Sequence, residues 1–404
     1  MNKKFVIINL MGQRKKNIRL IFLYLAFYGL SIGVWSDFAQ VWLNEQGITI
    51  SNIGLIIACA TFVAGIIIIV LTKYVKKVNE LFVLKCIFLL KALFLLLMFL
   101  GAYYSIKWLC ITSFIFDAIT NNLVASVTYP IIAYILKSES MYSKRKLVEY
   151  SATDLGLLIA SFLVGRQIGW WVVDYNAMIL LSLLFTICAI ISVFCIKNSK
   201  IFFAERKNNI KNIFKDKILR FYLFYFFICQ TAYFSALGMQ LLMIVRYAQF
   251  SSSTAGLFIV VGCVCGDLFG ILALKKLTPK NDCLTIFVKF GIRFLFYLAI
   301  VIFPIKEVFL VGLFVSYLIS RAYENKTDGI YVNRCDKADM FTFSNLRYIF
   351  GYMGKATGTL IVGFTFELGL SYIFGICLIF MALQMTMALY LIKMRKNEEK
   401  WLLC

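Results

Sequence analysis

Four polar or charged side chains share one face of a helix predicted over residues 308–332. Arg321, Glu324, Asn325 and Asp328 fall within an arc of about 100° on a helical projection. The arginine could hold an anionic group, and the two carboxylates could carry protons. The structural alternative places the lower part of this stripe near the end of the helix, where further charged residues follow.

A single acid, Asp37, interrupts the apolar stretch 20–43. Asp37, Gln40 and Asn44 share one helical face at spacings of three and four residues. A carboxyl group in apolar surroundings can take up and release protons near neutral pH. The structural alternative is a hydrogen bond from Asp37 to a neighbouring helix.

Other polar side chains lie deep in apolar stretches, where each needs a partner. Asp117 and Asn121 share a face of the segment 108–136, Gln230 lies within 219–245, and Lys355 follows Gly354. We therefore predict two sets of functional residues. The predicted substrate-binding residues are Arg321, Lys355, Asn121, Gln230 and Asp117, and the predicted proton-coupling residues are Asp37, Glu324 and Asp328.

Basic side chains also fall inside the apolar stretches. Some are close enough to a segment end for the charge to reach water, whereas others are not. We expect Asp267 to form a structural ion pair with Lys289 or Arg293. The basic residues inside the stretches are Lys85, Lys91, Arg166, Lys289, Arg293, Arg321, Lys326, Arg347 and Lys355.

The composition excludes several classes of protein. Of 404 residues, 62% are apolar and 15% are charged, and the mean hydropathy is +0.85. A soluble domain carries about 25% charged residues, so these values exclude soluble, disordered and nucleic-acid-binding proteins despite the net charge of +22. The chain has no histidine, and its cysteines show no C-x-x-C spacing. We expect neither a metal site nor a cofactor.

Twelve apolar segments are each long enough to cross a bilayer, which needs about 20 residues. The polar stretch 197–217 separates them into two groups of six. We predict an all-α polytopic membrane protein with an N-terminal bundle (1–196), a basic cytoplasmic linker (197–217) and a C-terminal bundle (218–404). The segments are 20–43, 52–72, 81–104, 108–136, 147–169, 174–196, 219–245, 254–274, 284–303, 308–332, 341–365 and 369–393.

Basic residues predict the orientation of these segments. With the N-terminus inside, the Lys and Arg residues outside the segments lie on the inner side, except Lys107, Arg246 and Lys306. This asymmetry follows the positive-inside rule. We therefore expect both termini to be cytoplasmic in a multi-pass protein of the cell membrane, and specifically of a bacterial plasma membrane.

The two halves resemble each other in sequence. Ser51-Asn52-Ile53-Gly54-Leu55 near the start of the second segment corresponds to Ser253-Thr254-Ala255-Gly256-Leu257 near the start of the eighth. Gly156 and Gly165 of the fifth segment recur as Gly354 and Gly363 of the eleventh. Both offsets are about half the chain. Internal repeats are typical of secondary transporters.

This organisation resembles the major facilitator superfamily, with six plus six spans, a basic central linker and a Gly-Leu near the start of spans two and eight. The family loop G-x-x-x-D-R/K-x-G-R/K-R/K corresponds to Thr72-Lys73-Tyr74-Val75-Lys76-Lys77. Here Thr72 replaces the acid and Val75 the glycine. The span-four arginine and the span-five Gly-Pro of many drug–proton antiporters are missing, so these motifs do not assign the chain to the drug-efflux branch.

The resemblance implies a secondary active transporter, and not an enzyme, that works by alternating access between two bundles. We predict proton-coupled export of an amphipathic or drug-like molecule. The alternative is ion-coupled uptake of an organic anion or other small solute, and a polytopic membrane enzyme is a distant third. The expected partners are a small-molecule substrate, a coupling ion that we take to be H⁺, and the lipid bilayer. We expect a monomer that binds no nucleic acid.

Overall fold

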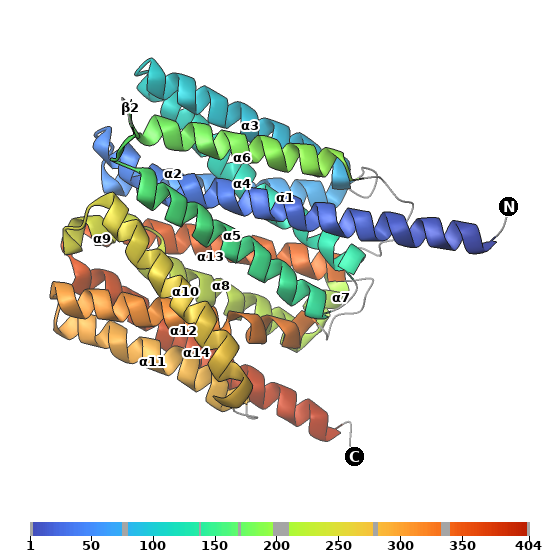
Figure 1. The fold of residues 1–404 in the computed structure, drawn as a ribbon. Helices are drawn as coiled ribbons and strands as arrows, with labels where there is room; N and C mark the ends of the chain where they lie inside the picture. Colours follow the sequence, from blue (N-terminus) through green and yellow to red (C-terminus); the bar gives the residue numbers. More distant parts are fainter. Residues whose placement is uncertain are drawn as a thin grey trace. The chain divides into compact units, whose positions relative to one another are not determined.

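The computed structural model describes residues 3–74, 80–136, 139–168, 171–196, 210–277, 282–332 and 340–401. The first half of the chain forms α1 (Lys3–Glu45), α2 (Ile50–Tyr74), α3 (Glu80–Tyr103), α4 (Lys107–Leu136), α5 (Glu139–Leu163) and α6 (Tyr175–Phe194). The second half forms α8 (Lys217–Leu237), α9 (Gln240–Ala248), α10 (Ser252–Leu277), α11 (Asp282–Ile302), α12 (Lys306–Val332), α13 (Met340–Thr365) and α14 (Leu370–Trp401) (Figure 1). Short helices α7 (Ile210–Lys215) and η2 (Phe366–Leu368) precede α8 and α14.

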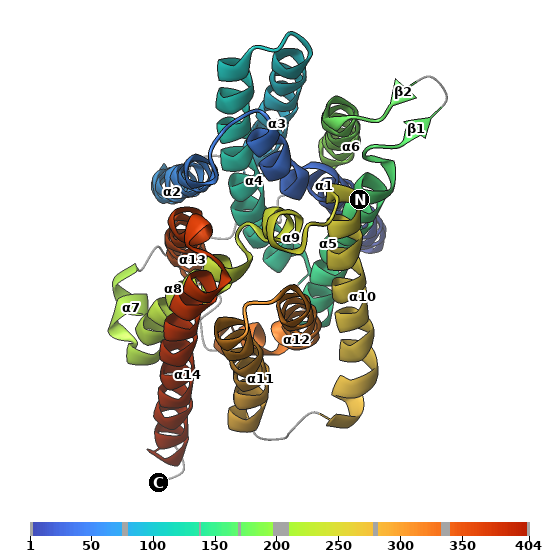
Figure 2. The same ribbon diagram turned by 90° about the vertical axis from the view of Figure 1, so that its left-hand side faces the viewer.

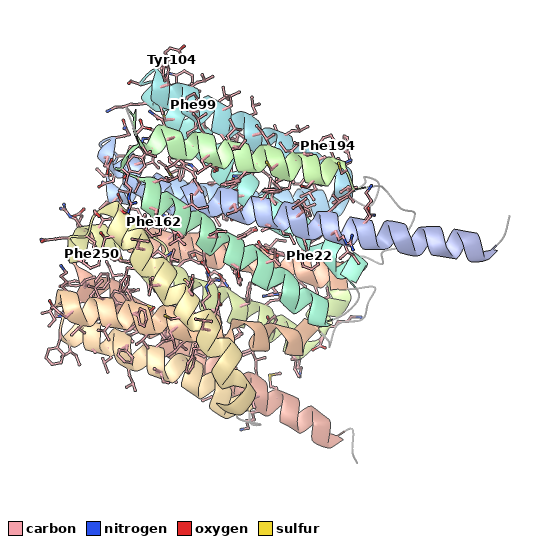
Figure 3. The ribbon with its side chains drawn as sticks, in the orientation of Figure 1. Phe22, Phe99, Tyr104, Phe162, Phe194 and Phe250 are labelled. Carbon is pink, nitrogen blue, oxygen red and sulfur yellow. The ribbon has the colours of Figure 1, made fainter. Side chains whose placement is uncertain are left out.

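Apolar side chains cover the lipid-facing sides of these helices. In α3, for example, Leu89, Leu90 and Leu93 are about half exposed. Within the described residues, eight helices are long and apolar enough to cross a bilayer. Figure 3 labels two exposed aromatic side chains at helix ends, Tyr104 just after α3 and Phe194 at the last residue of α6. Tyrosine at a helix end is typical of a membrane–water interface.

The chain folds into two compact units. Unit 1 comprises Met1–Ala39 and Ile67–Arg206, and unit 2 comprises Gln40–Ile66 and Lys207–Cys404. The last turns of α1 and most of α2 therefore belong to unit 2. The predicted division into 1–196, 197–217 and 218–404 follows the sequence repeat and remains a prediction.

A glycine allows two helices of unit 1 to approach closely. A Cβ atom at Gly156 of α5 would lie 2.5 Å from the carbonyl oxygen of Leu30 in α1. In unit 2, a Cβ atom at Gly354 of α13 would overlap the carbonyl oxygen of Phe227 in α8. Gly156 therefore lets α5 pack closely on α1, and Gly354 lets α13 pack closely on α8; in each half this is the fifth predicted span against the first. Figure 2 shows the second of these pairs, α8 beside α13.

Unit 2 fixes the end of α1 and the start of α2 through polar and glycine contacts. Gln40 Nε2 donates to the carbonyl oxygen of Gly238 at 3.3 Å, and Ser51 Oγ donates to that of Gly363 at 3.1 Å. A Cβ atom at Gly54 would lie 2.9 Å from the Cα atom of Gly363. These short approaches let backbones contact each other without side chains between them.

The seventh predicted segment, 219–245, is confirmed as a candidate span, Lys217–Tyr247, but the structure divides it into two helices. Asp216 caps α8 by accepting from the amides of Ile218 and Leu219 at 2.8 and 3.1 Å. The helix ends at Leu237, and α9 begins at Gln240 after Met239 leaves the helical conformation (φ −134°, ψ 41°). Such a break leaves backbone groups without a hydrogen-bond partner inside the helix. Gln40 donates a hydrogen bond to one of them, the carbonyl oxygen of Gly238.

The fifth predicted segment, 147–169, also ends too late. Helix α5 stops at Leu163 because Gly165 adopts φ +75°, and the chain then forms the antiparallel pair β1 (Gln167–Ile168) and β2 (Trp171–Val172). Arg166 consequently lies beyond the helix. Its side chain is exposed and stacks over the ring of Phe162 at 5.3 Å, so its predicted place inside a span is wrong.

Candidate functional site

An ion pair lies buried in unit 1 between α3 and α4. Lys91 Nζ donates to Asp117 Oδ1 at 2.8 Å, and the two side chains are 1% and 3% exposed. The helices pack side by side along their length (Figure 2). Since both charges are removed from water, each depends on the other, and loss of one partner would leave an uncompensated buried charge.

Asn121 completes this cluster. Its Nδ2 donates to Asp117 Oδ2 at 3.1 Å, one turn along α4. Tyr28 of α1 donates from its hydroxyl to the backbone oxygen of Asn121 at 2.8 Å, and its ring packs edge-on against Phe88 of α3. Among the described residues, the buried Asn121 Oδ1 has no hydrogen-bond partner. The cluster thus combines an ion pair with an acceptor that a ligand or a proton carrier could use.

The structure brings together two of the predicted substrate-binding residues, Asp117 and Asn121, and adds Lys91, which sequence reasoning left unassigned. The sequence does contain a signal for the pairing of Lys91 with Asp117. Lys91 is the basic residue in the middle of its span, and Asp117 is the acid in the middle of the next span, with a short connection between them. Buried charges in adjacent antiparallel helices tend to pair.

A second buried cation lies in unit 2. Arg293 of α11 is 6% exposed. Its Nε donates to Ser316 Oγ of α12 at 3.1 Å, and its Nη2 donates to the hydroxyl of Tyr297 at 3.3 Å. The Tyr297 and Ser316 hydroxyls are themselves hydrogen-bonded at 2.7 Å. The predicted ion pair between Asp267 and Arg293 is therefore wrong, because hydroxyl groups take its place. The alternative partner, the Lys289 side chain, lies outside the described residues.

Aromatic rings connect Arg293 to a further cation. The guanidinium carbon lies 5.6 Å from the ring centroid of Tyr297 and 6.0 Å from that of Tyr233 on α8. The Tyr233 ring meets that of Phe234 edge-on at 5.2 Å, and Lys355 Nζ of α13 lies 5.1 Å from the Phe234 centroid. Two cations thus border one pair of aromatic rings.

Gln230 lies one turn from this pair on α8. Its Cβ atom would be 2.9 Å from a Cβ atom at Gly354, the residue before Lys355. The close packing of α8 on α13 therefore places two predicted substrate-binding residues, Gln230 and Lys355, on adjacent helices.

No protein-family model matches the sequence, and no curated protein sequence matches it. Solved structures are similar to it. The human organic anion transporter MFSD10 (TETRAN) gives a TM-score of 0.69 at 13% identity, over 93% of this chain and 99% of that chain. A bacterial homologue of the human lysosomal transporter Spinster gives 0.68 at 12% identity, over 94% and 97%. FucP, a Major Facilitator Superfamily (MFS) transporter, gives 0.61 at 14% identity, over 94% and 98%.

This chain has the fold of an MFS transporter. The predicted fold class is confirmed, since the MFS fold covers nearly the whole chain and its spans correspond to the helices described above. With its long apolar helices, the chain is a multi-pass membrane protein. The low identities show the fold and not the substrate.

The remaining predicted residues are on two helices, Arg321, Glu324 and Asp328 on α12 of unit 2 and Asp37 on α1 of unit 1. Arg321 of α12 is partly buried, and its Cβ atom would be 2.9 Å from a Cβ atom at Gly266 of α10. Glu324 and Asp328 follow it on α12, but their side chains lie outside the described residues. Asp37 is partly buried on α1. The described part of the MFS fold contains no group of three or more Cys, Asp or Glu side chains that could hold a metal ion.

Proposed function

We propose that this chain is a secondary active transporter in which the Lys91–Asp117 pair couples solute movement to protons. The observation that carries the proposal is the 2.8 Å contact between two almost fully buried, oppositely charged side chains. The MFS fold supports transport, because the three solved structures named above belong to transporters. One of them, FucP, is a fucose:proton symporter.

The pair has two states that differ by one proton. With Asp117 ionised, its carboxylate neutralises Lys91 and accepts hydrogen bonds from Lys91 and Asn121. With Asp117 protonated, the attraction to Lys91 is lost and the ammonium group is left buried without a counter-charge. The second state favours any rearrangement that gives Lys91 a new anionic or hydrated environment. Proton binding can thereby bias the conformation of unit 1.

Two substrate classes remain under this proposal. Export of an amphipathic or drug-like molecule, the leading prediction, is favoured by the aromatic rings of Tyr233, Phe234 and Tyr297. Uptake of an organic anion is favoured by Arg293, whose described hydrogen-bond partners are hydroxyl groups. MFSD10, which shares the fold, is an organic anion transporter. The predicted plasma-membrane location, with both termini cytoplasmic, belongs to the same proposal.

The test uses one labelled probe for each class, ethidium for an amphipathic molecule and benzenesulfonate for an organic anion. The full chain is reconstituted in proteoliposomes, and probe accumulation is measured with and without a pH gradient. We expect the gradient to drive net movement of one probe in the wild type. Asp117→Asn should lose the response to the gradient, and probe exchange at equal pH shows whether the variant still folds and binds the probe.

Ser126→Ala is the matched control, because Ser126 is also buried on α4 but bonds only locally, to the Leu123 carbonyl at 2.9 Å. It should behave like the wild type in both assays. Gradient-driven movement that survives in Asp117→Asn would show that the pair does not couple transport. Wild-type movement of both probes that ignores the gradient would refute proton coupling altogether.

A further inference from the structure

The environment of Arg293 is unusual for a buried charge. Its guanidinium group has five N–H donors, and the structure gives hydrogen bonds to two neutral hydroxyl groups, those of Ser316 and Tyr297. Among the described residues no carboxylate pairs with Arg293, whereas the other buried cation, Lys91, has Asp117. A buried charge normally requires a counter-charge. The missing charge is the first sign of an anionic ligand.

Arg293 is held in a fixed orientation. Ser316 Oγ bonds both Arg293 Nε at 3.1 Å and the Tyr297 hydroxyl at 2.7 Å, which closes a small network between α11 and α12. The planar group also stacks near the rings of Tyr297 and Tyr233. A guanidinium fork whose position is fixed before binding suits an anion with two or three oxygens, because it can donate in parallel to two of them.

The rings of Tyr233 and Phe234 extend the cationic site with an apolar surface. They lie on adjacent positions of α8 and meet edge-on, with Arg293 near one ring and Lys355 near the other. A ligand that spans this region would meet a positive charge at each end and an aromatic surface between them. This is the arrangement that an anionic head group on a planar or apolar body would fit.

We propose that Arg293 binds the anionic group of an aromatic organic anion, a carboxylate, sulfonate or phosphonate, while Tyr233 and Phe234 contact its body and Lys355 adds a second positive charge. The site lies wholly within unit 2, on α8, α11, α12 and α13. This inference deepens the proposed function, on which it rests, by naming the substrate class. Substrate binding in unit 2 is then separate from proton carriage, which the Lys91–Asp117 pair performs in unit 1.

Binding is measured on the purified full chain in detergent, without any gradient, by isothermal titration calorimetry and by ligand-induced thermal stabilisation. The anionic probes are benzoate, benzenesulfonate and phenylphosphonate. Benzamide and benzenesulfonamide are neutral controls of nearly the same shape. We expect at least one anion to bind the wild type at least about tenfold more tightly than its neutral counterpart, because only the anion supplies the missing charge.

Variants separate binding from a structural role of Arg293. Arg293→Gln should reduce anion affinity by at least about tenfold, and Arg293→Lys, which keeps the charge but not the fork, should fall between Gln and the wild type. Tyr297→Phe removes the internal hydrogen bond but keeps the charge, so it should lower thermal stability more than anion affinity. If the only role of Arg293 were to join α11 to α12, this difference between thermal stability and anion affinity would not appear.

Lys355→Gln should also weaken anion binding. Its matched control is Lys306→Gln, because Lys306 makes a similar contact, 5.0 Å from the centroid of Phe250 at an exposed end of α12. Figure 3 labels Phe250, whose ring belongs to the segment before α10. Lys306→Gln should bind anions like the wild type.

The proposal is overturned if none of the three anions binds the wild type, if anions and neutral counterparts bind equally, or if folded Arg293→Gln binds anions with wild-type affinity. Because these measurements need no proton gradient, they stand apart from the transport assay. Anion binding without gradient-driven transport would refute the proton coupling and leave this site intact. Gradient-driven transport of ethidium without anion binding would support the proton coupling and refute the anion site at Arg293.

Discussion

Lys91 Nζ and Asp117 Oδ1 lie 2.8 Å apart between α3 and α4, and both side chains are almost fully buried. Lys91→Met should therefore destabilise the protein by about 3–5 kcal/mol, because it leaves Asp117 buried without a counter-charge. The double variant Lys91→Met with Asp117→Leu should recover most of that loss. Thermal unfolding of the purified variants in one detergent measures both effects. A single Lys91→Met variant that unfolds at the wild-type temperature would contradict the ion pair's structural importance.

Asp37→Asn tests the acid predicted on the first span. We expect it to abolish pH-driven transport in the proteoliposome assay, because an amide cannot take up the proton that a buried carboxylate carries. Asn44→Ala is the control, since Asn44 lies on the same face and bonds locally to the Ile48 carbonyl at 3.1 Å. Normal pH-driven flux in Asp37→Asn would show that Asp37 takes no part in proton coupling. Asp117 would then be the remaining proposed proton carrier.

Arg321→Ala tests the predicted substrate-binding arginine on α12. The substitution keeps the Cβ atom that packs near Gly266 and removes the charge, so the helix contact with α10 should survive. We expect weaker binding of the transported probe, measured as saturation binding of ethidium and benzenesulfonate to the purified protein. Unchanged affinity in a folded variant would assign Arg321 a structural role.

The helix contacts that repeat in the two halves make a paired prediction. Gly354→Ala and Gly156→Ala should both destabilise the protein, since the new methyl group meets a backbone oxygen of α8 or α1 that cannot move aside. Gly375→Ala on α14 is the control. A Cβ atom there has no described neighbour within 4 Å, and alanine favours helices over glycine by up to about 1 kcal/mol. Thermal unfolding midpoints should therefore fall for the first two variants and hold or rise for the third.

The positions of the helices could be predicted well from the sequence. Each predicted span overlaps a helix, and the seventh overlaps two, α8 and α9, because the length of an apolar run is a local property that the bilayer thickness limits. The errors fall where backbone conformation changes without a clear change in hydropathy. At Met239 the apolar run 219–245 continues while the helix stops, and at Gly165 the chain turns inside a segment that was predicted to run to residue 169.

The site was less predictable. Asp117 with Asn121 could be grouped, because a spacing of four places both on one helical face. Gln230 and Lys355 could be proposed individually, since a polar group in an apolar segment needs a partner. Hydropathy gives no indication of which faces of different helices meet, so Lys91 remained unassigned and Arg293 received the wrong partner.

The sequence alone determined that this chain lies in a membrane, that short glycine-containing stretches recur about half a chain apart, and that a small number of charges lie within the apolar spans. Composition, hydropathy and spacing suffice for these conclusions because each depends on a residue and its neighbours along the chain. The tertiary structure decided which charges are neutralised. Lys91 meets Asp117, whereas Arg293 meets two hydroxyl groups and aromatic rings. That difference arises from the packing of α3 on α4 and of α11 on α12, which depends on contacts between side chains far apart in sequence.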